Sequence, residues 1–118
     1  MQKCVFLDRD GVLNHAKVRN GKPFAPTSFD TFELYDDVND SLESLKSSGF
    51  LLVVVTNQPD VGNQKVGRDV VEAMHKYILS HTPVDAVFAC FHAQDAGCSC
   101  RKPKPGLLYA ASFQHFLL

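Results

Sequence analysis

The stretch that most constrains the fold is residues 50–55 (FLLVVV), which are apolar at every position and rich in β-branched side chains. A strand with one solvated face alternates apolar and polar residues, whereas a strand covered on both faces of a parallel sheet does not. Before it, Val38, Leu42 and Leu45 recur at helical spacing, and Gly49 stands where a helix cap belongs. The pattern predicts a helix that leads into the buried strand of a parallel sheet.

Two further strands extend this pattern. Residues 4–7 form a short apolar, β-prone run that stops at Asp8, and residues 84–89 supply a third short strand. A strand, a helix and a second strand in this order imply a right-handed crossover. We therefore expect an α/β fold with a parallel sheet. The 118 residues are enough for one domain, residues 1–118, with one core.

Residues 68–80 place apolar side chains at helical spacing and predict a second helix. We expect Met74 and Tyr77 on its core face. We expect His75 and His81 at the surface.

The polar stretch between the first strand and the first helix, residues 15–31, contains glycine and proline and predicts a loop without regular structure. Lys17, Arg19 and Lys22 would meet an anionic substrate if this loop folds over the sheet edge. A solvated basic loop is the alternative. His15 is expected at the surface.

Two aspartates stand at the end of the first predicted strand. Asp8 and Asp10 flank one residue, and Gly11 lets the backbone turn. Ligands of open α/β sheets bind beyond the carboxyl ends of the strands, so both carboxylates would lie at the rim of a site. A carboxylate is ionised at pH 7 and can act as a nucleophile, and a second carboxyl beside it can act as acid and base. A solvated turn is the structural alternative.

Phosphoryl transfer suits this pair of acids. We expect Asp8 to attack phosphorus and form an aspartyl-phosphate. Asp10 would protonate the leaving oxygen and later take a proton from water. Mg²⁺, bound by Asp8 and Asp10, would offset the repulsion between the nucleophile and the phosphate dianion.

Other polar residues follow the second and third strands. Thr56 ends the second strand, where its hydroxyl could donate a hydrogen bond to phosphate or simply terminate the strand. Arg101 and Lys102 lie just after the third strand in a proline-rich segment. Arginine can pair with phosphate in a forked geometry, and lysine can act as a point charge. A solvated basic turn is the alternative.

A cluster of metal-ligating side chains lies in the loop of residues 90–100. Cys90 and His92 are followed after a five-residue gap by Cys98 and Cys100. Three thiols and one imidazole match a closed tetrahedral zinc site, and Zn²⁺ would stabilise a loop with little apolar content. Four protein ligands leave no open position, so we expect a structural role. Free cysteines beside a surface histidine are the alternative.

These motifs together resemble one known family. Residues 6–14 (FLDRDGVLN) resemble motif I of the haloacid dehalogenase-type phosphatases, in the branch of histidinol-phosphate and heptose-bisphosphate phosphatases. Residues 56–58 (TNQ) resemble motif II, residues 101–103 (RKP) resemble motif III, and the cysteine-rich loop is similar to that of this branch. The resemblance implies a Rossmann-like fold without a cap domain, and Mg²⁺ as the catalytic cofactor.

The resemblance also assigns roles to individual residues. Asp8 would be the nucleophile and Asp10 the general acid and base. Thr56 and Lys102 would hold the phosphoryl group. Asn57 and Arg101 would contact the substrate.

The chain departs from the family in two places. Residues 59–62 (PDVG) replace the small residues expected after motif II, and no Asp or Glu follows Asp95. The acidic motif IV that completes the Mg²⁺ site is therefore missing, as if the fold were truncated after the third strand and its following helix. We expect weak Mg²⁺ binding and little turnover from these residues alone. The first strand would form an exposed edge that favours self-association.

The leading hypothesis is a phosphomonoesterase for D-glycero-D-manno-heptose 1,7-bisphosphate, acting on the 7-phosphate. Histidinol phosphate is an alternative substrate, and a catalytically incomplete, zinc-stapled α/β binding domain is an alternative class. A formal net charge of −1 and ligand spacing unlike a zinc finger argue against a nucleic-acid partner. No stretch has the length of a membrane span, and the free thiols predict a cytoplasmic protein.

Overall fold

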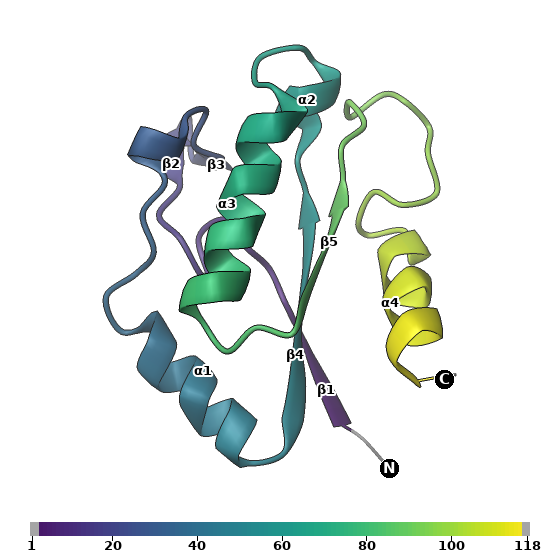
Figure 1. The fold of residues 1–118 in the computed structure, drawn as a ribbon. Helices are drawn as coiled ribbons and strands as arrows, with labels where there is room; N and C mark the ends of the chain where they lie inside the picture. Colours follow the sequence, from purple (N-terminus) through teal and green to yellow (C-terminus); the bar gives the residue numbers. More distant parts are fainter. Residues whose placement is uncertain (1–2, 117–118) are drawn as a thin grey trace.

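The structure, a computed structural model, describes residues 3–116 and is built on a three-stranded parallel sheet (Figure 1). The strands are β1 (Lys3–Leu7), β4 (Phe50–Asn57) and β5 (Ala86–Cys90), in the order β1-β4-β5. The register pairs Leu7 with Val54, and Thr56 with Ala89, so the carboxyl ends of all three strands meet at one edge. The expected α/β fold is confirmed.

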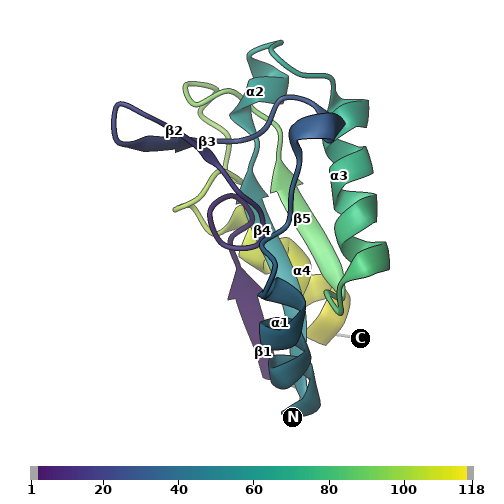
Figure 2. The same cartoon turned by 90° about the vertical axis from the view of Figure 1, so that its left-hand side faces the viewer.

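The central strand β4 is buried on both faces, as its apolar sequence predicts. Leu52 and Val54 pack with the helices α1 (Val38–Ser47) and α3 (Arg68–His81). Val53 and Val55 pack on the opposite face with residues of α4 (Gly106–Phe116). Figures 1 and 2 show α1 and α3 on one side of the sheet and α4 on the other. The sheet therefore forms the middle layer, with a hydrophobic cluster on each side.

The expectation of an irregular loop before α1 is wrong. The strands β2 (Lys17–Arg19) and β3 (Lys22–Phe24) form an antiparallel hairpin, followed by the 3-10 helix η1 (Phe29–Thr31). Asn20 and Gly21 form its turn, with φ of 51° and 74°. An Asn-Gly pair suits a tight hairpin turn because both residues accept positive φ. Figure 2 shows this hairpin projecting to one side of the sheet, at the end of the molecule where β1 and β4 finish.

Helix α3 differs from expectation at one important position. Met74 is fully buried as predicted, but His75 is only 8% exposed and does not lie at the surface. Tyr77 is half-buried rather than in the core, and its ring contacts Phe29 and Phe32 at centroid distances of 5.8 and 6.2 Å.

Among residues 3–116, no helix is long and apolar enough to cross a membrane. Within the same residues, β1 pairs with β4 on one side and with no strand on its other side. Self-association through that edge stays a prediction.

Candidate active site

A cavity of about 560 Å³ opens at the edge where the three parallel strands end. Asp8 follows β1, Thr56 lies near the end of β4, and Lys102 follows the loop after β5. The structure brings together the residues expected to bind phosphate and perform the chemistry. Asp8, Asp10, Thr56, Asn57, Arg101 and Lys102 all line this cavity.

Asp8 and Lys102 form an ion pair at the mouth of the cavity, although they lie far apart in sequence. The Asp8 side chain is 60% exposed, so its carboxylate is open to an incoming ligand. Asn57 fixes the backbone that carries the lysine: its side chain accepts from Lys102 N at 2.9 Å and donates to Lys102 O at 3.2 Å. The expected substrate contact of Asn57 stays a prediction, beside this structural role.

Both carboxylate oxygens of Asp10 accept hydrogen bonds from neighbouring side chains. Its Oδ1 accepts from Arg9 Nε at 3.1 Å, from Arg9 Nη2 at 2.8 Å and from Asn14 Nδ2 at 3.0 Å. Its Oδ2 accepts one hydrogen bond from the residues that the structure describes, from Gln58 Nε2 at 2.8 Å. A carboxylate has about four lone-pair sites, so Oδ2 keeps capacity for a proton while Oδ1 is saturated.

Thr56 is buried, and its hydroxyl oxygen accepts from Gln58 Nε2 at 2.9 Å. The one amide group of Gln58 therefore contacts both Thr56 and Asp10. Because the Thr56 oxygen already accepts, its own hydrogen is available for a ligand oxygen. The geometry suits a hydroxyl that donates to phosphate.

Arg101 brings a guanidinium group to the same cavity. Its Nη1 is buried and has no hydrogen-bond partner among the described residues. A buried donor without a partner costs about 1–3 kcal/mol, which an arriving anion would offset. The site thus combines Asp8 with a cationic wall formed by Arg101 and Lys102.

The four expected zinc ligands converge after β5. The ligand atoms of Cys90, His92, Cys98 and Cys100 all lie within 4.8 Å of one another. Cys90 Sγ is 3.5 Å from Cys98 Sγ and 3.4 Å from His92 Nδ1. Tetrahedral Zn²⁺ with bonds of about 2.3 Å to sulfur separates its sulfurs by roughly 3.7 Å, so this donor set fits the ion.

The thiols of this cluster differ in acidity. Burial raises the pKa of Cys98, but hydrogen bonds to the Arg101 backbone and to the neighbouring thiols outweigh it and lower the pKa to about 6. Burial and the contacts with Cys90 and Cys98 raise the pKa of Cys100 to about 12. A bound metal would displace the protons of these thiols.

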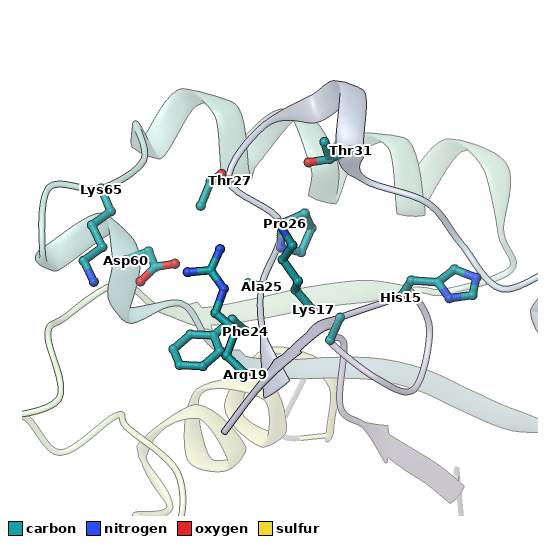
Figure 3. Close-up of a pocket in the computed structure, with 11 residues that line it drawn as sticks. His15, Lys17, Arg19, Phe24, Ala25, Pro26, Thr27, Thr31, Asp60 and Lys65 are labelled. Atoms are coloured by element: carbon teal, nitrogen blue, oxygen red, sulfur yellow. The ribbon is translucent and has the colours of Figure 1, made fainter. Parts of the chain in front are cut away.

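A second cavity of about 400 Å³ adjoins the first and shares Phe24, Ala25, Asp60 and Lys65 with it. The hairpin contributes Lys17 and Arg19. Figure 3 shows the Arg19 guanidinium extending towards Asp60 and Lys65 of the facing segment. Among the described residues that line this cavity, Asp60 is the one acid, and it is outnumbered by Lys17, Arg19 and Lys65. The cavity therefore favours an anion.

Comparison with known proteins identifies the family. A family model described as polynucleotide kinase 3 phosphatase matches residues 3–115. The chain belongs to this family. It is a haloacid dehalogenase-type phosphatase domain, of the branch that includes heptose-bisphosphate phosphatases and the histidine biosynthesis bifunctional proteins. The expected family is confirmed.

Two relatives show how similar the chain is to individual proteins of this branch. It is 35% identical to the D-glycero-beta-D-manno-heptose-1,7-bisphosphate 7-phosphatase of Pasteurella multocida, covering 94% of this chain and 63% of that protein. It is 34% identical to the histidine biosynthesis bifunctional protein HisB of Legionella pneumophila, covering 92% of this chain and 31% of that protein. The chain therefore spans less than two thirds of the length of either relative.

A solved structure of the family has the same fold. The D,D-heptose 1,7-bisphosphate phosphatase from B. bronchiseptica, complexed with magnesium and phosphate, superposes with a TM-score of 0.79 at 28% identity. The match covers 96% of this chain and 63% of that one.

Sequence reasoning missed four residues of the hydrogen-bond network around Asp10, namely Arg9, Asn14, Gln58 and His75. Arg9 and Gln58 stand inside the family motifs, but their burial at 1% and 2% exposure gives them contacts that spacing does not reveal. His75 lies on α3, and its ring nitrogen is 3.1 Å from Arg9 Nη1. No local sequence pattern marks that contact, because it joins positions 66 residues apart.

Proposed function

We propose that this chain carries the nucleophile and the phosphate-binding wall of a metal-dependent phosphomonoesterase for a small phosphorylated metabolite. The observation that carries the proposal is the exposed Asp8 carboxylate, which forms an ion pair with Lys102 at the mouth of a cavity that Asp10 and Thr56 also line. A carboxylate can act as the nucleophile, and the neighbouring ammonium group can neutralise charge on the transferred phosphoryl group. The curated phosphatase relatives support the reaction class.

The proposed reaction has two steps. An Asp8 carboxylate oxygen attacks phosphorus, the bond from phosphorus to the leaving oxygen breaks, and Asp10 gives that oxygen its proton. Water then attacks the aspartyl-phosphate while Asp10 takes a proton from it, and the bond between phosphorus and Asp8 breaks. Asp8 returns as a carboxylate, Asp10 is protonated again, and phosphate is released.

Mg²⁺ fits the oxygen donors at the end of β1. Asp8 and Asp10 would hold the ion, which usually takes one or two carboxylates and completes its shell with water and substrate phosphate. When bound, Mg²⁺ supplies charge neutralisation between the nucleophile and the phosphate. A magnesium ion accompanies phosphate in the related B. bronchiseptica structure.

We favour a bisphosphate, as in D-glycero-D-manno-heptose 1,7-bisphosphate, over histidinol phosphate. Histidinol phosphate carries an ammonium group, which the basic side chains Lys17, Arg19 and Lys65 would repel. A second phosphate group would meet these cations. An inactive phosphate-binding domain is the competing class, since the chain has no acid after Asp95.

The direct test is to locate the phosphoryl group. The purified chain is incubated with Mg²⁺ and acetyl phosphate, a reactive small donor, then quenched in acid and mapped by mass spectrometry. We expect one added phosphoryl group, on Asp8, and competition by BeF₃⁻. Phosphate binding without any modification of Asp8 would leave the inactive binding domain as the better description.

Replacing Arg19 by alanine tests the bisphosphate preference. We expect the Kd of a sugar bisphosphate, measured by calorimetry, to rise about ten-fold, or ~1.4 kcal/mol. The Kd of the matching monophosphate should stay unchanged, because that ligand has no second phosphate group to place near Arg19 in the second cavity. Lys76→Ala, on the exposed side of α3, is the control. An equal loss for both ligands would contradict a separate second-phosphate contact.

A further inference from the structure

Arg9 is a buried cation with partners at both ends. Its side chain is fully buried, and Nε and Nη2 both donate to Asp10 Oδ1. Its Nη1 lies 3.1 Å from His75 Nε2 and 3.6 Å from Met74 Sδ, and the guanidinium stands 5.5 Å from the ring centroid of Phe32. The guanidinium thus bridges the acid of the active site and the middle of α3.

The chemistry of the two groups fixes the direction of the bond to His75. A guanidinium has donors and no acceptor, so His75 Nε2 must accept the hydrogen bond from Arg9. The imidazole is then neutral and carries its proton on Nδ1. Burial, and secondarily the charge of Arg9, lower the pKa of His75 to about 4, in agreement with a neutral ring.

A contribution to stability alone does not explain why Arg9 links Asp10 to His75. A buried ion pair such as Arg9–Asp10 contributes little net stability, because desolvation opposes the Coulomb attraction. It does give one definite orientation to the carboxylate. With Oδ1 fixed by Arg9, Oδ2 is the oxygen left to Gln58 and to the cavity.

We propose that His75 is a positioning residue for Asp10: it accepts a hydrogen bond from Arg9 and so fixes the guanidinium that aims the Asp10 carboxylate at the reacting oxygen. The inference rests on the proposed function, in which Asp10 takes the proton of the attacking water. In that step water oxygen bonds to phosphorus, its proton moves to Asp10 Oδ2, and Asp8 leaves as a carboxylate. His75 itself touches neither substrate nor phosphoryl group.

Two substitutions separate positioning from packing. His75→Leu fills the space without an acceptor, whereas His75→Gln offers its Oε1 to Arg9 at about the reach of Nε2. Acetyl phosphate has a good leaving group and needs little help from an acid, so Asp8 should be phosphorylated at nearly the wild-type rate in both variants. Hydrolysis of the aspartyl-phosphate needs Asp10 as the base. The rate of this step should therefore depend on how well the Asp10 carboxylate is oriented.

We expect His75→Leu to hydrolyse the aspartyl-phosphate about ten-fold more slowly than wild type, within the contribution of general base catalysis, so that the phosphorylated chain accumulates. His75→Gln should recover to within about three-fold, since the accepted hydrogen bond returns. His81→Leu, on the exposed last turn of α3, is the matched control and should behave as wild type. Wild-type hydrolysis in folded His75→Leu, or equal slowing in His75→Gln, would overturn the proposal.

A measurement on the wild-type chain keeps the proposal testable if His75→Leu fails to fold. Nitrogen NMR of the histidine ring should show His75 at neutral pH with an unprotonated Nε2 and a protonated Nδ1. A protonated Nε2 would overturn the proposal, because it cannot accept from Arg9. If wild-type Asp8 takes no phosphoryl group, the proposed function fails, and the NMR result still decides whether His75 holds Arg9.

Discussion

Asp8→Asn is expected to abolish phosphoryl transfer to the chain. The amide keeps the size of the carboxylate and can still contact Lys102, but it has no charge and is a very poor nucleophile. Removing the nucleophile of an enzyme that works through a covalent intermediate costs on the order of 10³-fold or more. After incubation with acetyl phosphate and Mg²⁺, the mass spectrum of this variant should show the unmodified chain alone.

The same substitution should leave the fold almost unchanged. The Asp8 side chain is 60% exposed, and exposed ion pairs contribute only about 0–1 kcal/mol. Thermal unfolding monitored by circular dichroism should therefore match wild type closely. Asp40→Asn, on the exposed first turn of α1, is the control and should still be phosphorylated. Phosphorylation of Asp8→Asn at the wild-type rate would show that another residue receives the phosphoryl group.

The sheet could be predicted because short, continuous stretches of sequence indicate its strands. Residues 50–55 have no polar side chain, and only a strand covered on both faces tolerates that pattern. The structure shows Leu52, Val53 and Val54 completely buried. Convergence of Asp8, Thr56 and Lys102 then follows from topology, because parallel strands end at the same edge.

The hairpin was also predictable from local sequence, but the prediction gave too much weight to glycine and proline as breakers. Asn20-Gly21 between the short segments β2 and β3 is a recognised turn pair. Pro23 is compatible with β3 because the two-stranded ribbon consists of edge strands. Its consequence is functional, since the hairpin places Lys17 and Arg19 in the wall of the second cavity.

The network behind Asp10 could not be predicted in this way. A histidine on an amphipathic helix usually lies on the solvent side, and the surface position expected for His75 is wrong. Its burial depends on Arg9, which is drawn inward by Asp10 and lies against Phe32. The burial of each of these residues follows only from the positions of the others. Sequence spacing on one helix contains none of that information.

Loss of the metal from the cysteine-rich loop is expected to have the largest effect on stability. We expect the purified chain to contain one Zn²⁺, held by Cys90, His92, Cys98 and Cys100. Binding of structural zinc to small peptides is worth about 10–16 kcal/mol, and a domain is stable by only about 5–15 kcal/mol. Stripping the metal with a strong chelator should therefore leave this loop unfolded. The Tm of the domain should fall by more than about 10 °C.

The cations of the active site should respond to the same treatment. Lys104 Nζ donates to Cys98 O at 2.9 Å, and Gly106 N donates to Ser99 O at 3.1 Å, so the residues directly after Arg101 and Lys102 are hydrogen-bonded back to the cysteine loop. Without the metal this segment loses its anchor, and inorganic phosphate should bind at least about ten-fold more weakly by calorimetry.

The matched variants are Cys100→Ser and Cys4→Ser. Cys100 is a proposed ligand, whereas Cys4 lies on β1 outside the cluster and is only partly buried. Cys100→Ser should lose zinc, thermal stability and phosphate affinity together, and Cys4→Ser should keep all of them, apart from a small loss of packing. A metal-free preparation that melts and binds phosphate like wild type would refute the structural role, because the loop would then be held by its own hydrogen bonds.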